Sequence, residues 1–146
     1  MRQMSHEALW SLGCLFVLKG ATADLEVIEA VAPAGYSPPL HRHDFGTESF
    51  YVLEGEVRFV VGDADVTHGP GGFAHVPRQA PHSFRVLGGD PARMLLIVAP
   101  AGQWDFFAEC GEPAPAERLP DAIDIPANLA DRIARHGGAV LGPPLT

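Results

Sequence analysis

Three histidines and one glutamate stand at spacings that could build a metal site. His41 and His43 are separated by one residue, so on a β-strand both side chains point to the same face. Glu48 follows after a loop that contains Gly46, and this loop must reset the alternation, because a straight strand would turn Glu48 to the wrong face. His82 opens a different strand and would approach from across a barrel. These four side chains therefore predict one site for a divalent metal ion.

The ligand types narrow the choice of ion and of bound molecule. Neutral imidazole and carboxylate suit iron, nickel, manganese, cobalt, copper or zinc better than calcium or magnesium. One carboxylate charge would face the two positive charges of the ion, so the site favours an anionic or enolisable oxygen ligand in its open positions. A single histidine is more often an ordinary hydrogen-bonded residue than a ligand. The hypothesis therefore depends on the four residues together.

Apolar side chains share the strand faces of the candidate ligands. Two residues on the strand of Glu48 and two on the strand of His82 have the parity of the ligand itself, which predicts an apolar wall beside the metal. A tyrosine shortly before His41 could donate a hydrogen bond to a bound small molecule. Plain core packing is the alternative for each of these residues. The residues expected to line the substrate pocket are Tyr36, Phe50, Val52, Phe84 and Val86.

The composition fits one acidic domain over residues 1–146. The net charge is −8 with neutral histidines, and Lys19 is the single lysine. An acidic chain binds phosphate backbones poorly, and no basic run suggests a membrane surface, so we expect neither nucleic acid nor a membrane as a partner. Cys14 and Cys110 are far apart and belong to no Cys-x-x-Cys pair. They fit two free thiols in a reducing cytoplasm better than a disulfide.

The apolar run 8–18 resembles the core of a signal peptide, and residues 21–23 resemble a cleavage site. However, the charged Lys19 lies between the apolar run and the cleavage-like residues, and the run is too short to span a bilayer. Its side chains also alternate, and this period of two is typical of a strand. We therefore predict a strand here. The residues of one parity are Trp10, Leu12, Cys14, Phe16 and Leu18.

Short strands separated by turns dominate the chain as far as Pro100. The 16 glycines and 14 prolines recur every few residues, and no helical period lies between Asp24 and Pro100. This spacing predicts an all-β sandwich or barrel, with the barrel core at about residues 9–100. We expect strands at residues 24–31, 41–43, 48–53, 56–61, 64–68, 73–76, 82–87 and 92–99.

The pattern changes after residue 100. Leu129 and Ile133 form an i, i+4 pair that indicates a short helix, and several large aromatic residues precede it. We expect residues 101–146 to pack on the barrel as a short helical extension. The alternative is a disordered linker with a partner-binding helix. The expected order is one or two helical turns over 103–110, an irregular connector over 112–126, a helix over 126–136 and an extended end over 139–144.

The glycine and histidine spacings resemble the two motifs of the cupin superfamily. Gly35-x5-His41-x-His43-x4-Glu48-x6-Gly55 resembles the first motif, and Gly71-x5-Pro77-x4-His82 resembles the second. The resemblance implies a small single-domain cupin, an antiparallel jelly-roll barrel, and one metal held by the two motifs. Two residues depart from the second motif, which usually has glycine in place of Gln79 and often asparagine in place of Val86. The first departure concerns the shape of the turn 77–81.

Three segments are similar to bacterial cupins of the quercetinase family: residues 41–55, residues 75–84 and the Gly-Pro-Pro-Leu ending. That resemblance implies cleavage of a flavonol or related enol by dioxygen. The metal would bind the deprotonated substrate, and Glu48 would serve as ligand and base. Because cupins host several chemistries on one site, two alternatives remain open. One is a non-catalytic metal- and small-molecule-binding or regulatory module, and the other is a metal-assisted isomerase or decarboxylase.

Other polar residues near the motifs have simpler expected roles. Asp44 could orient an imidazole or be an ordinary loop residue. His68 and His75 are expected to be structural, with His75 also a candidate support for a ligand. His6 and His136 are expected to be solvated.

Tyr51 and Leu53 are apolar and lie on the strand face opposite Glu48. A strand that is apolar on both faces needs cover on both. We therefore predict a homodimer, formed through sheet faces or swapped edge strands.

Overall fold

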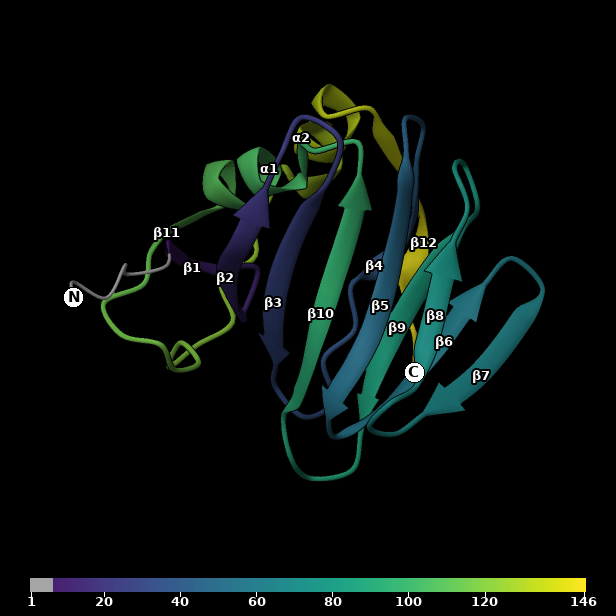
Figure 1. The fold of residues 1–146 in the computed structure, drawn as a ribbon, viewed down its shortest axis with the longest axis horizontal. Helices are drawn as coiled ribbons and strands as arrows, with labels where there is room; N and C mark the ends of the chain where they lie inside the picture. Colours follow the sequence, from purple (N-terminus) through teal and green to yellow (C-terminus); the bar gives the residue numbers. More distant parts are fainter. Residues whose placement is uncertain (1–6) are drawn as a thin grey trace.

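Two β-sheets and two short helices make up residues 7–146, the part of the chain that the computed structural model describes (Figure 1). The first sheet contains β1 (Ala8–Ser11), β2 (Cys14–Ala21), β3 (Glu26–Ala32), β5 (Thr47–Glu54), β8 (Phe73–Val76), β10 (Ala92–Ala99) and β11 (Gly111–Pro113). The second contains β4 (Pro39–His43), β6 (Glu56–Val61), β7 (Ala64–His68), β9 (His82–Leu87) and β12 (Gly138–Pro144). The helices are α1 (Gln103–Glu109) and α2 (Leu129–Arg135).

Segments that are distant in the sequence pair within each sheet. The first sheet runs β11-β1-β2-β3-β10-β5-β8, and the second runs β12-β4-β9-β6-β7. Every pairing in both sheets is antiparallel. The predicted all-β fold with an antiparallel jelly-roll arrangement is therefore confirmed. Among residues 7–146 no helix has the length and apolar character needed to cross a membrane.

The core lies between the two sheets because the strands alternate in burial. Along β3 and most of β10, every second side chain is buried. Ile28 and Met94 from the first sheet, and Val57 and Val86 from the second, are almost completely shielded from solvent. The period-two pattern in the sequence thus places one face of each strand in a shared interior.

The apolar run 8–18 forms a hairpin rather than the single strand that we predicted. Ser11 pairs with Cys14, and the chain reverses at Leu12 and Gly13. These two residues have φ angles of 55° and 85°, which a tight two-residue hairpin turn requires. The side chains alternate on both sides of the turn, so parity could not reveal it. As expected, Cys14 and Cys110 are free, and both are buried.

The segment after residue 100 packs against the first sheet and then joins the second. Phe107 of α1 stacks on Phe16 of β2, with ring centroids 3.8 Å apart. The Ser11 hydroxyl donates to the Phe107 carbonyl at 2.7 Å, and the buried Glu26 carboxylate accepts the Trp104 backbone N–H at 3.1 Å. Part of the expected irregular connector pairs with β1 as β11, and α2 begins at Leu129, later than we predicted.

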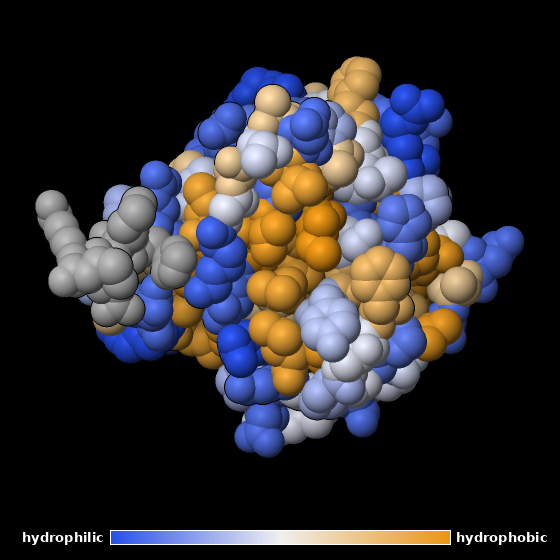
Figure 2. Space-filling view, viewed as in Figure 1, coloured by the Kyte–Doolittle hydropathy of each residue, from blue (hydrophilic) through white to orange (hydrophobic). Residues whose placement is uncertain are grey.

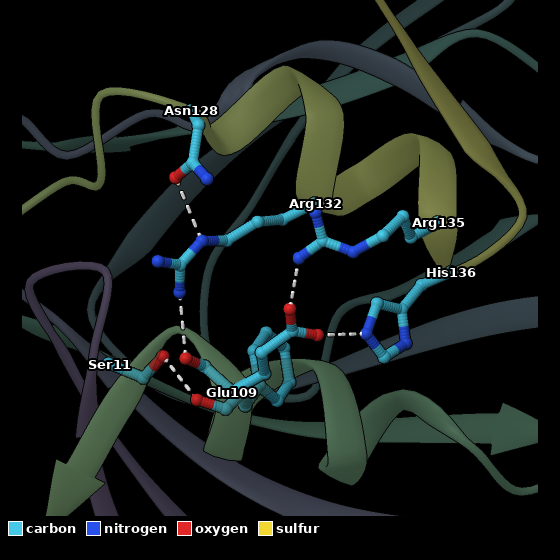
Figure 3. A network of polar contacts seen from close by, with 7 residues as sticks. Ser11, Glu109, Asn128, Arg132, Arg135 and His136 are labelled. Atoms are coloured by element: carbon cyan, nitrogen blue, oxygen red, sulfur yellow. Dashed lines mark hydrogen bonds and ion pairs between the residues drawn. The ribbon is translucent and has the colours of Figure 1, made fainter.

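A polar network joins α1 to α2 (Figure 3). The Glu109 carboxylate accepts hydrogen bonds from Arg135 and pairs with the ring of His136. Arg132 donates to the Glu109 backbone carbonyl at 2.8 Å and to the Asn128 side chain at 2.9 Å. His136, which we expected to be solvated, is instead held by Glu109. The network fixes the second helix over the first.

Replacing Phe107 tests whether this packing anchors the extension. Phe107→Ala should lower the free energy of unfolding by about 3 kcal/mol, because it removes a buried ring and leaves a cavity against Phe16. Urea unfolding measures the change. Phe45→Ala is the matched control, since this ring is 76% exposed. Equal effects of the two substitutions would contradict the assigned role of Phe107.

Candidate metal centre

Three imidazoles converge where β4 pairs with β9. His41 and His43 lie on β4, and His41 is the register partner of His82 on β9. One ring nitrogen from each of the three lies within 4.8 Å of the other two. The His41 ring centroid is 4.3 Å from that of His82 and 5.0 Å from that of His43. The same-face prediction for the two β4 histidines accounts for this convergence.

Backbone carbonyls fix the orientation of two of the rings. Nδ1 of His41 is 2.7 Å from the Pro39 carbonyl oxygen, and Nδ1 of His82 is 2.9 Å from the Ala80 carbonyl oxygen. With the proton on Nδ1 the carbonyl accepts it, which leaves Nε2 unprotonated and available as a ligand.

The turn before His82 keeps the shape that the motif requires despite its departure from glycine. Gln79 adopts a φ of 69°, in the left-handed region that glycine favours. Its backbone N–H donates to the His43 carbonyl at 2.8 Å, which ties the turn to β4. The substitution therefore leaves the approach of the two motifs intact.

The buried nitrogens of the cluster fit a metal ion. Nε2 of His43 and Nε2 of His82 are shielded from solvent and have no hydrogen-bond partner among the described residues. Buried polar atoms are nearly always partnered, so two orphaned nitrogens in one cluster indicate a missing partner that accepts lone pairs. A divalent transition metal ion is such a partner, and imidazole suits zinc, copper, iron and nickel.

Glu48 lies beside the histidine cluster. Its side chain is buried on β5, and Oε1 is 3.4 Å from Nε2 of His82, an ion-pair contact that does not have hydrogen-bond geometry. Gly46 makes the approach feasible, because its φ is 131° and a Cβ there would lie 2.6 Å from the Ala99 carbonyl oxygen. This glycine lies in the loop that was expected to reset the alternation between His43 and Glu48.

The charge states suit metal binding. Burial, aided by the neighbouring His82 and His43, lowers the pKa of His41 to about 4, so its ring is neutral at pH 7. Burial alone would raise the pKa of Glu48, but the nearby His82 and the other imidazoles outweigh it and lower the pKa to about 2. The contact with Glu48 likewise outweighs burial and raises the pKa of His82. The site therefore combines an ionised carboxylate with a neutral His41, whereas His82, whose proton Glu48 stabilises, would release that proton on binding an ion.

The cluster forms part of the wall of a cavity of about 360 Å³. Tyr36, Phe50 and Phe84, which were expected to line a substrate pocket, lie in the wall of this cavity. Val52 and Val86 lie in the hydrophobic core instead, with 0% and 1% of their surface exposed. Parity gives the face of a strand but not the depth along it, which explains the difference.

Sequence reasoning missed the part of the wall that comes from the ends of the chain. The N-terminal hairpin contributes Cys14, and the C-terminal segment contributes Phe106, Ile123, Ile125 and His136. No motif or parity relation links these residues to the histidines. Their position depends on tertiary packing alone.

Two polar side chains of the wall are those of Cys14, which is buried, and Tyr36, which is partly buried. Burial raises the pKa of the Cys14 thiol to about 12. Burial also raises the pKa of the Tyr36 hydroxyl well above its usual range. Both groups therefore stay protonated and can act only as neutral donors or acceptors.

The remaining candidates lie outside the cluster. Asp44 pairs with Arg42 at 2.9 Å and does not orient an imidazole. His75 contacts the Ser49 hydroxyl at 2.8 Å, and the ring of His68 packs against Phe59. Both histidines therefore have structural contacts, His68 on β7 and His75 on β8, in different sheets.

A family model described as "Cupin domain" matches residues 27–98, from β3 to β10, including all the candidate ligands. This chain belongs to the cupin superfamily. The resemblance of its two motifs to those of cupins is thereby confirmed, together with the jelly-roll fold that it implied.

Individual relatives agree with this assignment. Quercetin 2,3-dioxygenase from Bacillus subtilis strain 168 is 30% identical over 95 residues, which cover 65% of this chain but 28% of that protein. The crystal structure of TT1209 from Thermus thermophilus shares 28% identity with a TM-score of 0.56, and covers 60% of this cupin and 83% of that chain. An RmlC-like cupin from Shewanella frigidimarina has a TM-score of 0.61 at 18% identity, over 72% and 99% of the two chains, which is a likeness of fold.

Removing one histidine tests the metal centre. At a metal concentration a hundred times its Kd, a bound ion should stabilise this cupin by about 2.7 kcal/mol, and His82→Ala should lose most of that gain. Calorimetric unfolding with and without the ion, together with elemental analysis, measures both quantities. His75→Ala is the matched control, because this imidazole contacts Ser49 outside the cluster. Undiminished binding by His82→Ala would exclude the assigned site.

Proposed function

We propose that this cupin is a mononuclear metal-dependent dioxygenase of the quercetinase type, acting on a flavonol or another enol-like aromatic substrate. The observation that carries the proposal is the cluster of His41, His43 and His82, which opens onto an apolar cavity and has two orphaned Nε2 atoms. The 30% identity to the Bacillus subtilis quercetin 2,3-dioxygenase supports the reaction class. Iron, nickel, manganese, cobalt, copper or zinc would suit these ligands.

The three imidazoles would hold the ion, with the Glu48 carboxylate as a fourth ligand. When bound, the metal supplies Lewis acidity toward an enol oxygen and, for redox-active ions, chemistry with dioxygen. The carbonyls of Pro39 and Ala80 would keep two of the rings oriented while they bind. His41, with its pKa near 4, has no proton to lose on binding at pH 7.

Glu48 can act in either of two ways. A carboxylate with a pKa near 2 is ionised at neutral pH, which suits an anionic ligand. The same low pKa makes it a weak proton acceptor, because general bases work best with a pKa near the working pH. Glu48 nevertheless lines the cavity beside the imidazoles, where an acidic substrate hydroxyl could reach it. The ligand role is therefore favoured over the base role, and a substitution can separate them.

The cavity would bind and orient the organic substrate. Its volume of about 360 Å³ is at the small end of the range for pockets that enclose drug-sized molecules. Phe50 and Phe84 line it, with their ring centroids 5.7 Å apart, and would pack against an aromatic ring. Tyr36, held protonated by burial, could donate a hydrogen bond to a substrate oxygen. These walls would also exclude water from the reacting atoms.

A non-catalytic module that binds a metal and a small molecule is the second candidate. It is favoured by the small number of acid–base groups in the cavity wall. Outside the three-histidine cluster these are Cys14, Tyr36, Glu48 and His136, the last of which is paired with Glu109. Tyr36 and Cys14 stay protonated, and Glu48 is a weak base. A metal-assisted isomerase or decarboxylase would need a proton donor or acceptor that these groups supply poorly.

The two free cysteines support a further proposal, that this cupin works in the reducing cytoplasm.

Oxygen consumption tests the reaction. Metal-free protein is reconstituted with each candidate ion in turn and mixed with a panel of flavonols and diketones in an oxygen electrode. At least one ion should give uptake of one dioxygen per substrate, since a dioxygenase needs no other oxidant. Failure with every ion would exclude the oxygenase and leave the binding module and the metal-assisted isomerase or decarboxylase.

Glu48→Gln separates the two roles of the carboxylate. If Glu48 is a base, the variant should keep its metal and lose about a hundredfold in kcat. If Glu48 is a ligand, the metal content itself should fall. Glu56→Gln, an exposed glutamate on β6, is the matched control and should change neither quantity.

A further inference from the structure

The cavity reaches solvent beside an irregular segment of the chain, residues 119–126. Ile123 and Ile125 from this segment line the cavity, yet they are 56% and 44% exposed. Large aliphatic side chains at the solvent edge of an apolar cavity gain burial when a ligand fills the space beneath them.

Both ends of this segment are anchored. Before it, β11 pairs with β1, Trp10 donates its indole N–H to the Arg118 carbonyl at 2.7 Å, and the Arg118 guanidinium lies 4.8 Å from the Trp10 ring centroid. After it, α2 is held to α1 by Glu109 (Figure 3). Between the anchors, within the described chain, the backbone of residues 120–125 forms no hydrogen bond with other backbone groups. Side-chain contacts position this stretch: Asp121 pairs with Arg118 at 3.2 Å, and the isoleucines pack.

That packing closes over the N-terminal hairpin. A Cβ at Gly13 would lie 2.7 Å from Cγ2 of Ile123, so the isoleucine side chain rests directly on the hairpin turn. The next residue, Cys14, lines the cavity and is buried. Movement of Ile123 away from the turn would therefore expose the cavity wall at Cys14.

We propose that residues 119–126 form an apolar clamp, in which Ile123 and Ile125 contact the organic ligand and select large apolar molecules. The identity of the ligand rests on the proposed function. The clamp adds to that function the residues of the same cavity that discriminate among substrates. The anchored ends let the segment lift and close again as a unit.

The Cys14 thiol reports on the clamp without any reaction. In a Cys110→Ser background, N-ethylmaleimide labels Cys14 only when the clamp opens, because the thiol is otherwise buried. The double variant Ile123→Ala/Ile125→Ala should label about tenfold faster and bind quercetin about tenfold more weakly, with unchanged metal content. Val66→Ala is the matched control, since Val66 is 46% exposed on β7, away from the cavity.

A wild-type labelling rate in the double variant would overturn the clamp. Absence of oxygen uptake together with faster labelling would sink the oxygenase and leave the clamp standing. The two failures are thus distinguishable.

The outer face of the seven-stranded sheet carries an exposed apolar patch. Figure 2 shows hydrophobic side chains gathered on the face seen in Figure 1, where β3, β10 and β5 lie. Register places Leu95 beside Tyr51, and Tyr51 beside Phe73, across three strands. Ile97 lies two residues along from Leu95 and pairs with Val27. Tyr51 and Phe73 are 39% and 54% exposed.

A row of four charges crosses the same sheet next to this patch. Lys19 pairs with Glu29 at 3.3 Å, Glu29 with Arg93 at 3.4 Å, and Arg93 with Glu54 at 3.3 Å. The four residues come from β2, β3, β10 and β5, so the signs alternate from strand to strand.

This alternation makes the face complementary to itself. Consider a two-fold axis that runs parallel to the strands and lies above the sheet between β3 and β10. It would place a second copy face to face with the first, with the order of its four charges reversed. Each positive charge then meets a negative one, with Glu29 opposite the Arg93 of the second copy and Lys19 opposite its Glu54. Exposed apolar area supplies the attraction in such an interface, and charge complementarity fixes its register.

We infer that this sheet face binds a second copy of the chain in a two-fold dimer. The dimer would bury the apolar patch that the fold leaves uncovered. Face-to-face packing, rather than exchange of edge strands, is the form that the charge row supports.

Charge reversal tests the dimer by light scattering at micromolar concentration. Wild type should have the mass of two chains. Arg93→Glu should be monomeric, because like charges then meet across the interface, and Arg93→Glu/Glu29→Arg should dimerise again. Arg58→Glu, which breaks an ion pair with Asp65 on the other sheet, is the control and should stay dimeric. A monomeric wild type, or a dimeric Arg93→Glu, would refute the interface.

Discussion

The antiparallel contact between β4 and β9 is the interaction on which the site depends. It sets His41 opposite His82, although some forty residues separate them in the chain, and it carries His43 along on the same face. β12 supports β4 from its other edge, so the end of the chain holds the first motif in place. The hydrogen bond from Gln79 to His43 ties the second motif to the same strand. A metal ion could be held here because strand pairing fixes the three imidazoles before any ion arrives.

The same interior that packs the barrel gives the histidines their chemistry. Burial keeps His41 neutral and leaves two imidazole nitrogens without partners, which is costly in a stable fold. Such a cost is usual where a ligand completes the site. Phe50 and Phe84 continue the apolar surface away from the cluster. The proposed binding of a metal and of an apolar molecule therefore share one physical origin, the exclusion of water from a closed sheet interior.

The C-terminal segment adds walls to the cavity that the two motifs do not supply. α1 packs through Phe107 on the first sheet, and the Glu109 network holds α2 over α1. Together they bring Phe106, Ile133 and His136 to the cavity wall. Cupins use one ligand arrangement for many reactions. Because these walls come from outside the two motifs, they can differ between cupins and so change which molecule the cavity selects.

Local order could be predicted from the sequence because it depends on nearby residues. Turn residues between short segments placed β6, β7, β8, β9 and β10 at their observed bounds. His41 and His43 were assigned to one face because side chains alternate along a strand. The hairpin at Leu12 and Gly13 escaped prediction, since the alternation runs through the turn. Only the fold decided that Val52 and Val86 belong to the core, and that Ile123 and His136 reach the cavity. The sequence by itself determined residue types and strand faces, because side-chain direction follows backbone period. The tertiary structure decided depth and distance, because these depend on which remote strands meet.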